Sequence, residues 1–270
     1  MNLKAIAPKK ALGQNFLTDR NIARKTVDLL DIQDGDNVVE IGPGTGALTS
    51  IILEKNCNLT AIEIDTRAID ELNKLFPKKK FPNFNLVNTD FRSFDFEAND
   101  PKLKVIGNIP YYLSSEIFFK LFESKENIQI AVMTIQKELA KRLISKPGTK
   151  DYGILSIAMM MCGKCKMEFD VSPQCFYPAP NVWSSVIKMD FAQPEYEVGD
   201  YRKTMNVVRM AFNQRRKMMG NSLKSHFQKV ELENLDDEIS LKLSKYKLRR
   251  PEELLPDDFD FLTRNFTEQK

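Results

Sequence analysis

One short stretch of the chain, residues 107–112 with the sequence GNIPYY, carries groups that could hold a reacting amine. Asn108 offers a side-chain oxygen. Ile109 precedes Pro110 and is therefore confined to extended conformations, which fixes the direction of its carbonyl. Tyr111 adds a flat aromatic face. Two acceptors beside one ring can grip a planar exocyclic amine such as the N6 group of adenine; the alternative is an ordinary loop with an asparagine turn and a packed tyrosine.

A second group of residues predicts a bound nucleoside. The apolar run 37–41 leads into the glycine-rich turn 42–46, where the absence of side chains lets the backbone approach a ligand closely. Glu63 follows the next apolar run at about the 20-residue spacing at which a carboxylate meets a ribose hydroxyl pair. Asp90 ends a third run, with Phe91 beside it, and its carboxylate can accept a hydrogen bond from an adenine amino group.

These residues meet at one edge of a sheet if strands and helices alternate along the chain. Amphipathic or apolar segments typical of helices separate most of the apolar runs typical of strands, which lie at 37–41, 59–64, 85–88, 103–106, 128–135, 166–171 and 183–191. This alternation predicts an α/β fold with a doubly wound, mainly parallel sheet, whose ligands bind at the carboxyl ends of the strands. The last two runs have no helix between them, so we expect a hairpin that closes the sheet with an antiparallel edge.

The composition changes at Gln193-Pro194, which predicts a boundary between a domain at 1–193 and a domain at 194–270. Beyond the boundary the pattern is helical only, with helices expected at 201–212 and at about 219–227.

Cations of this second domain cluster at Arg215, Arg216 and Lys217, with Lys224 nearby. The cluster predicts contact with nucleic-acid phosphates, and the alternative is a solvated helical face. The whole chain of 270 residues has a formal net charge of +3, which is compatible with a locally basic face but too small to establish nucleic-acid binding.

Composition and cysteine spacing argue against a membrane protein and a metalloprotein. No apolar run approaches the roughly 20 residues of a membrane span, and the charged N-terminus lacks the apolar segment of a secretory signal, so we expect a cytoplasmic protein. Cys162 and Cys165 form a C-x-x-C pair, but Cys57, Cys175 and His226 lack the paired spacing that a zinc site requires. We therefore expect buried, reduced thiols and no bound metal.

Six motifs, in order along essentially the whole chain, resemble the rRNA adenine N6,N6-dimethyltransferase family, in particular its members that modify two adjacent adenosines near the 3′ end of small-subunit rRNA. The motifs are KKALGQNFL at 9–17, VVEIGPGTGALT at 38–49, AIEID at 61–65, GNIPYYLSS at 107–115, FYPAPNVWSSV at 176–186 and AFNQRRKMMGNSL at 211–223. The resemblance implies a Rossmann-like, S-adenosylmethionine-dependent methyltransferase sheet of seven strands, the last one antiparallel, followed by a small helical domain that binds RNA.

The resemblance also implies roles for the positions that match these motifs. The implied cofactor is S-adenosyl-L-methionine, with Asn15 and Leu17 closing over it, Glu63 on the ribose and Asp90 on the adenine; the full implied set is Asn15, Leu17, Gly42, Gly44, Glu63, Ile64, Asp90, Phe91 and Asn108. Asn108 would bridge cofactor and target amine within the catalytic set Asn108, Ile109, Pro110, Tyr111 and Phe176, of which Tyr111 and Phe176 would stack on the flipped adenine. The family often has leucine where Ile109 stands, but the backbone carbonyl carries that role.

The implied partner is small-subunit rRNA within a pre-ribosomal small subunit, bound by a monomer away from any membrane. One alternative is a large-subunit rRNA adenine dimethylase, which shares the N-terminal half; the helical C-terminal segment and its cations argue against it. A second is a non-catalytic ribosome-assembly factor, which the intact cofactor motifs disfavour. A nicotinamide oxidoreductase is disfavoured by Ala47, which replaces the last glycine of the dinucleotide fingerprint.

Overall fold

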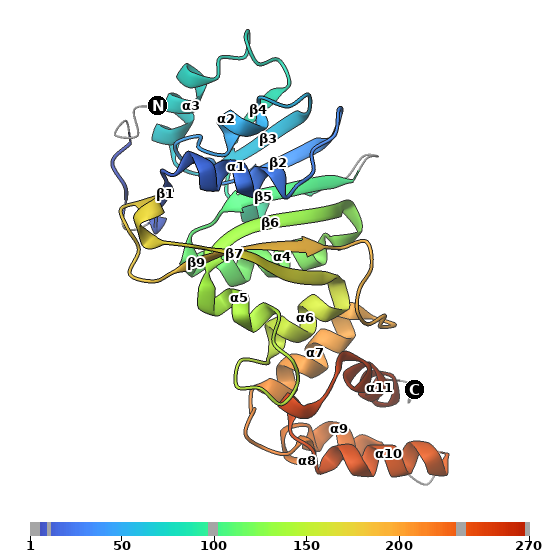
Figure 1. Ribbon diagram of the computed structural model, residues 1–270. Helices are drawn as coiled ribbons and strands as arrows, with labels where there is room; N and C mark the ends of the chain where they lie inside the picture. The colour runs from blue at the N-terminus through green and yellow to red at the C-terminus, as the bar shows by residue number, and fades with distance from the viewer. Residues whose placement is uncertain (1–5, 10–11, 97–101, 231–235, 268–270) are drawn as a thin grey trace. The chain divides into compact units, whose positions relative to one another are not determined.

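The computed structural model describes residues 6–9, 12–96, 102–230 and 236–267, and it forms two compact units (Figure 1). The first unit contains the described residues up to Ala140 together with Lys164–Gln193, and the second contains Lys141–Gly163 together with the described residues from Pro194 onward. The chain passes from the first unit to the second after Gln193, where the sequence predicts the domain boundary. Segment 141–163, which the sequence assigns to the first domain, belongs to the second unit instead.

The first unit is built on a seven-stranded sheet with the order β4-β3-β2-β5-β6-β9-β7. Neighbouring strands from β4 to β6 pair in parallel, and β9 is antiparallel to both β6 and β7. The strands are β2 (Asn37–Ile41), β3 (Asn58–Glu63), β4 (Phe84–Asn88), β5 (Leu103–Asn108), β6 (Ile128–Gln136), β7 (Lys164–Val171) and β9 (Ser184–Asp190). The expected seven strands and the expected antiparallel pairing of the last two are confirmed. The antiparallel strand β9 lies inside the sheet, however, and β7 forms its edge.

The chain reverses its direction of travel across this sheet between β2 and β5. It moves outward from β2 to β3 and β4, then returns to place β5 beside β2 and continues to β6. The loops that follow β2 and β5 therefore leave the sheet in opposite directions, and a crevice opens between them at the carboxyl ends of the strands.

Two helices of the first unit begin at residues whose side chains cap them. Asp19 accepts hydrogen bonds from the backbone N–H groups of Asn21 and Ile22, and Asp65 accepts one from Arg67, so each caps the helix that follows it. The capped helices are α1 (Arg20–Asp28) and α3 (Thr66–Leu75). The other helices are α2 (Thr49–Ile52), α4 (Ser114–Glu123) and α5 (Lys137–Leu143), the last of which crosses the boundary between the units. Helix α2 is short, because residues 54 and 55 form tight turns toward β3.

A small two-stranded sheet joins two segments that are far apart in the sequence. β1 (Phe16–Leu17) pairs antiparallel with β8 (Phe176–Tyr177), so that Phe16 faces Tyr177 and Leu17 faces Phe176. The sequence pattern does not predict this pairing, because each strand has only two residues. It fixes the N-terminal segment against the loop that precedes β9.

In its described residues the second unit is helical. Its helices are α6 (Ile154–Cys162), α7 (Tyr201–Phe212), α8 (Met219–Ser222), α9 (Lys224–Lys229), α10 (Asp237–Lys247) and α11 (Pro256–Thr267). Segment 141–163 packs here through Tyr152, which is fully buried and donates from its hydroxyl to the carbonyl of Leu254 at 2.7 Å. The single helix expected at 219–227 is divided at Leu223, whose backbone leaves the helical region. Among the helices of the described residues, none is long and apolar enough to cross a membrane.

Candidate active site

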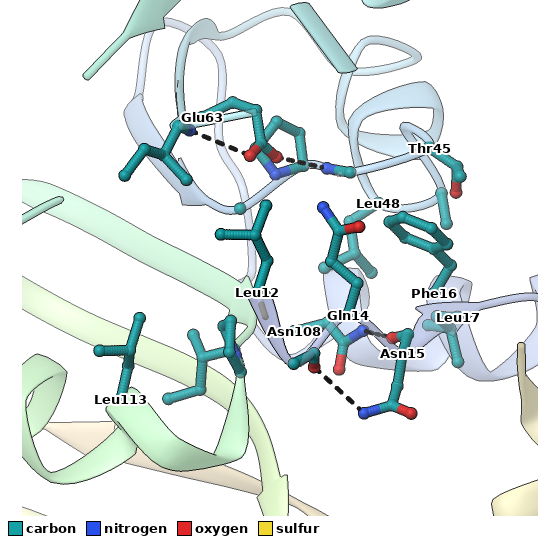
Figure 2. Close-up of a pocket in the computed structure, with 18 of the residues that line it drawn as sticks. Leu12, Gln14, Asn15, Phe16, Leu17, Thr45, Leu48, Glu63, Asn108 and Leu113 are labelled. Carbon is teal, nitrogen blue, oxygen red and sulfur yellow. Dashed lines mark hydrogen bonds between the residues drawn. The ribbon is translucent and has the colours of Figure 1, made fainter. Parts of the chain in front are cut away.

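A cleft lies at the carboxyl ends of β2, β3 and β5, where the sheet reverses (Figure 2). Ile41 of β2 and Gly107 of β5 are partners at the ends of adjacent strands. The glycine turn and the GNIPYY segment therefore begin side by side. Figure 2 shows Glu63 on one side of the cleft, with Asn108 and Asn15 on the other.

The glycine turn after β2 forms an open cradle. Gly42 and Gly44 have φ values of 69° and 53°, a left-handed conformation that other residues rarely adopt. A Cβ atom on Gly44 would lie 2.9 Å from the ring of Phe16, whereas a Cβ atom on Gly42 would meet no heavy atom within 4 Å. The space beside Gly42 is thus open to a ligand, and the close approach of Phe16 requires glycine at position 44.

Glu63 presents a fixed carboxylate at the end of β3. Its Oε2 accepts from the backbone N–H of Gly44 at 3.1 Å, and its Oε1 accepts from Ile64 at 3.0 Å and Asp65 at 2.9 Å. The residue is only 6% exposed, and burial raises the pKa of Glu63 while these backbone hydrogen bonds oppose the rise. A carboxylate can accept about four hydrogen bonds and three are already made, so a pair of ligand hydroxyls would share the remaining position or displace a backbone N–H.

The side chain of Asn108 is oriented by the N-terminal segment. Its Nδ2 donates to the backbone carbonyl of Asn15 at 2.8 Å. Because a carbonyl can only accept, this contact holds the amide nitrogen toward Asn15 and leaves Oδ1 as the acceptor on the other side. The nearby Tyr111 is fixed as well, since its hydroxyl lies 2.7 Å from Oγ of Ser184 on β9.

The N-terminal segment forms one wall of the cleft and is fastened by Asp65. Gln14 donates from Nε2 to Oδ2 of Asp65 at 3.0 Å, and Arg67 donates from Nε to Oδ1 at 3.0 Å. The hydrogen bonds from Arg67, together with that from Gln14, lower the pKa of Asp65 to about 2. Sequence reasoning missed Gln14 and Asp65. Positions 10 and 11 of the same motif lie outside the described residues.

Most of the residues expected at the site line this one cleft. They are Asn15, Leu17, Gly42, Gly44, Glu63, Ile64, Asn108, Ile109, Pro110 and Tyr111. They come from four separated stretches of sequence, which the sheet edge and the β1–β8 pairing bring together.

Three other expected residues do not line the cleft. Asp90 is held by Arg92, whose Nε lies 2.9 Å from Oδ1 and 3.0 Å from Oδ2 of the carboxylate. Phe91 is 7% exposed, and Phe176 is 4% exposed within the hydrophobic core that contains Leu17. Their contacts with adenine rings therefore stay predictions.

Glu40 is a second residue of the cleft that sequence reasoning missed. It lies on β2, is 1% exposed, and its Oε2 accepts from the Thr49 hydroxyl at 2.6 Å. Burial, with a smaller contribution from the charge of Glu63, raises the pKa of Glu40 to about 7. The available signal was a charged residue in an otherwise apolar buried strand directly before the glycine turn.

We expect Glu40→Gln to remove a pH dependence of stability. Because the folded-state pKa of about 7 exceeds the ordinary value of 4.5, the wild-type protein loses free energy of unfolding as the pH rises from 4.5 to 7. The loss should be roughly 3 kcal/mol above pH 7, and the neutral amide of the variant should avoid it. Urea unfolding at pH 5 and pH 8 measures the difference, with Glu126→Gln, at an exposed carboxylate, as the control. Equal pH dependence in wild type and Glu40→Gln would contradict this reading.

The strand order, the open glycine cradle after the first sheet strand and the acidic side chain after the second define a Rossmann-like, S-adenosylmethionine-dependent methyltransferase fold. More specifically, the chain belongs to the ribosomal RNA adenine dimethylase family, whose model matches residues 6–254. The fold class and the family expected from the sequence are confirmed.

Individual relatives agree with this membership. The chain is 43% identical over 231 residues to ribosomal RNA small subunit methyltransferase A of Prosthecochloris aestuarii, an alignment that covers 82% of this chain and 84% of the relative. A dimethyladenosine transferase structure from Plasmodium falciparum aligns with a TM-score of 0.77 at 25% identity, covering 92% and 95% of the two chains. The 23S rRNA methyltransferase ErmE aligns with a TM-score of 0.67 at 23% identity, covering 94% and 100%, which shows a shared fold.

Proposed function

We propose that this protein transfers methyl groups from S-adenosyl-L-methionine to N6 of two adjacent adenosines near the 3′ end of small-subunit rRNA, giving N6,N6-dimethyladenosine. The observation that carries the proposal is that one cleft contains the Glu63 carboxylate and Asn108, whose Oδ1 is left as an acceptor because its Nδ2 donates to Asn15. One can hold a ribose and the other an exocyclic amine. The small subunit is proposed as the substrate because the relatives at high coverage carry that name.

The cleft fits the cofactor that the fold implies. Glu63 would accept from the two ribose hydroxyls, and the open side of Gly42 would lie against the methionine part. Asn15 and Leu17 would cover it from the N-terminal segment. When bound, the cofactor supplies an electrophilic methyl group on a sulfonium. Asp90 would have to exchange its contact with Arg92 to accept from the adenine amino group.

The residues of the GNIPYY segment would then make the target amine reactive. The N6 atom of adenine is a poor nucleophile, because its lone pair is delocalised into the ring. Hydrogen bonds from its two protons to Oδ1 of Asn108 and to the carbonyl of Ile109 would favour a pyramidal nitrogen and direct the lone pair toward the methyl group. A strong base is unnecessary, since the proton becomes acidic once nitrogen is alkylated. In-line positioning would provide most of the rate enhancement.

The target base must leave its stack to reach the cleft, as in other enzymes that act on a base. Tyr111 would stack on the flipped ring, and its hydrogen bond to Ser184 holds its own ring in place. A second methylation of the same amine requires release of the spent cofactor and renewed loading between the two transfers.

Incubation of small-subunit rRNA and, separately, large-subunit rRNA with the protein and isotopically labelled S-adenosylmethionine, followed by mass spectrometry of RNA fragments, tests the proposal. We expect label in two adjacent adenosines near the 3′ end, each with two methyl groups. Label in large-subunit rRNA would instead support the large-subunit dimethylase. Absence of label from every rRNA, with cofactor binding intact, would support a non-catalytic ribosome-assembly factor.

We further propose that the helical unit contacts rRNA phosphates and that the enzyme acts as a cytoplasmic monomer on a pre-ribosomal small subunit. Arg216, Lys217 and Lys224 are exposed. Arg215 is a weaker candidate than the sequence suggests, because its Nε lies 2.8 Å from Oε2 of Glu252. The proposed phosphate surface is therefore Arg216, Lys217 and Lys224.

Replacing these three cations by glutamine should weaken RNA binding and flatten its salt dependence. Each lost phosphate contact should reduce the slope of log K against log salt by about 0.7 to 1, because fewer counterions are released. Filter binding between 50 and 200 mM salt, the range over which such slopes are measured, provides the slope. Glutamine replacement of Lys55, Lys79 and Lys80, which are exposed on the first unit, is the charge-matched control. Identical slopes for both triple variants would place the phosphate contact elsewhere.

A further inference from the structure

Two large aromatic side chains stand exposed at the two ends of the loop between β8 and β9: Tyr177 is the last residue of β8, and Trp183 directly precedes β9. Tyr177 is 55% exposed and Trp183 is 52% exposed, although tryptophan is usually highly buried. Their loop contains Pro178 and Pro180, which restrict its backbone. Exposed rings on such a restricted backbone present flat surfaces at little cost in conformational entropy.

Both ends of this loop are attached to the wall of the cleft. Tyr177 is the β-pairing partner of Phe16, which lines the cleft. Ser184, directly after Trp183, lies within hydrogen-bond distance of the Tyr111 hydroxyl, and the Trp183 carbonyl accepts from the backbone N–H of Lys137 at 3.0 Å. The exposed rings therefore belong to a segment that borders the place where the target base would enter.

An RNA substrate needs a surface beside that entrance. When one adenine leaves its stack, the adjacent base loses a stacking partner and exposes a π-face to water. Aromatic side chains bind such faces, and the loss of one stacked ring typically costs on the order of 1 to 3 kcal/mol.

We propose that Trp183, with Tyr177, forms a stacking platform for the nucleotide next to the target adenosine. This inference rests on the proposed function and adds to it a contact with a second base. The platform would hold the RNA strand at the cleft while either of two adjacent adenosines occupies it. The binding chemistry is that of a single-stranded nucleobase, because the only groups the platform requires are flat aromatic faces.

The sequence contains a single tryptophan, so the intrinsic fluorescence of the protein at long excitation wavelength reports on Trp183 alone. Two short single-stranded RNAs are used as probes, with one adenosine flanked either by normal nucleotides or by abasic ribose phosphates. Their backbone charge is the same. We expect the normal RNA to quench Trp183 at saturation and the abasic RNA to quench it at least several-fold less. Equal quenching by both RNAs, or no quenching while anisotropy shows bound RNA, would overturn the proposal.

Variants at positions 182 and 183 separate the contribution of the Trp183 ring to RNA binding from that of the other RNA contacts. Trp183→Ala should weaken binding of the normal RNA on the order of 10-fold and leave binding of the abasic RNA unchanged. Trp183→Phe should recover part of the loss, and Val182→Ala, at a neighbour that is 44% exposed, should have no effect. The single-turnover methylation rate at saturating RNA should stay near wild type for Val182→Ala. If Trp183→Ala weakened the binding of the normal and the abasic RNA to the same extent, the proposal of a stacking platform would also be overturned.

The failure of this inference and the failure of the proposed function give different results. If the rRNA is dimethylated but Trp183 shows neither quenching nor loss of affinity on substitution, the enzyme assignment stands and the platform is wrong. If base-dependent quenching occurs but no rRNA is methylated, the platform stands as a nucleic-acid contact and the proposed activity is wrong.

Discussion

Asn108→Ala should lower the rate of methyl transfer on the order of 100-fold or more, the scale observed when a preorganised hydrogen-bonding group is deleted. The substitution removes Oδ1, one of the two proposed acceptors for the target amine, so the nitrogen stays flatter and less nucleophilic in the transition state. It also removes the hydrogen bond to the carbonyl of Asn15. We therefore expect a smaller loss of cofactor affinity beside the loss of rate.

Single-turnover methylation at saturating cofactor and RNA separates the transfer rate from binding. Asn108→Asp keeps an oxygen acceptor but cannot donate to Asn15, so it should retain more of the rate than Asn108→Ala while showing weaker cofactor binding. Asn88→Ala is a matched control, because Asn88 also ends a strand and donates from Nδ2 to a backbone carbonyl, that of Glu63. A transfer rate for Asn108→Ala within about threefold of wild type would mean that Asn108 is only a turn residue.

Glu63→Ala should weaken S-adenosylmethionine binding by roughly 2 to 3 kcal/mol, or about 30- to 150-fold. The substitution removes the proposed ribose contacts. It also removes the hydrogen bond from the backbone N–H of Gly44 to Oε2 of Glu63, 3.1 Å long, which holds the glycine turn in place. Isothermal titration calorimetry with the cofactor measures the loss of affinity. Unchanged affinity would remove Glu63 from the binding site.

A second substitution at the same position tests the geometry. Glu63→Gln keeps the shape but replaces one acceptor oxygen by a donor, which must face either the N–H of Gly44 or those of Ile64 and Asp65. We expect it to bind the cofactor more weakly than wild type as well. Thermal unfolding without cofactor separates a loss of fold from a loss of binding, and RNA affinity should be unchanged in both variants.

Sequence alone determined the parts of this protein whose signals are local. Strands β2 and β3 are mainly apolar runs, broken by Glu40 in one and Thr60 in the other, and the glycines between them allow a turn that other residues rarely adopt. Strand, turn and the position of Glu63 therefore followed from neighbouring residues. The position of Asn108 could be predicted for the same reason, since it follows an apolar run and precedes Ile109, whose backbone Pro110 restricts.

Only the tertiary structure decided which side chains are free to act. Nothing near Phe176 in the sequence indicates that a two-residue pairing with Leu17 buries it, and nothing near Arg215 indicates that Glu252, far along the chain, pairs with it. The place of β9 between β6 and β7 is likewise set by long-range pairing. Side-chain burial and ion pairs depend on residues distant in sequence, and local patterns carry no information about them.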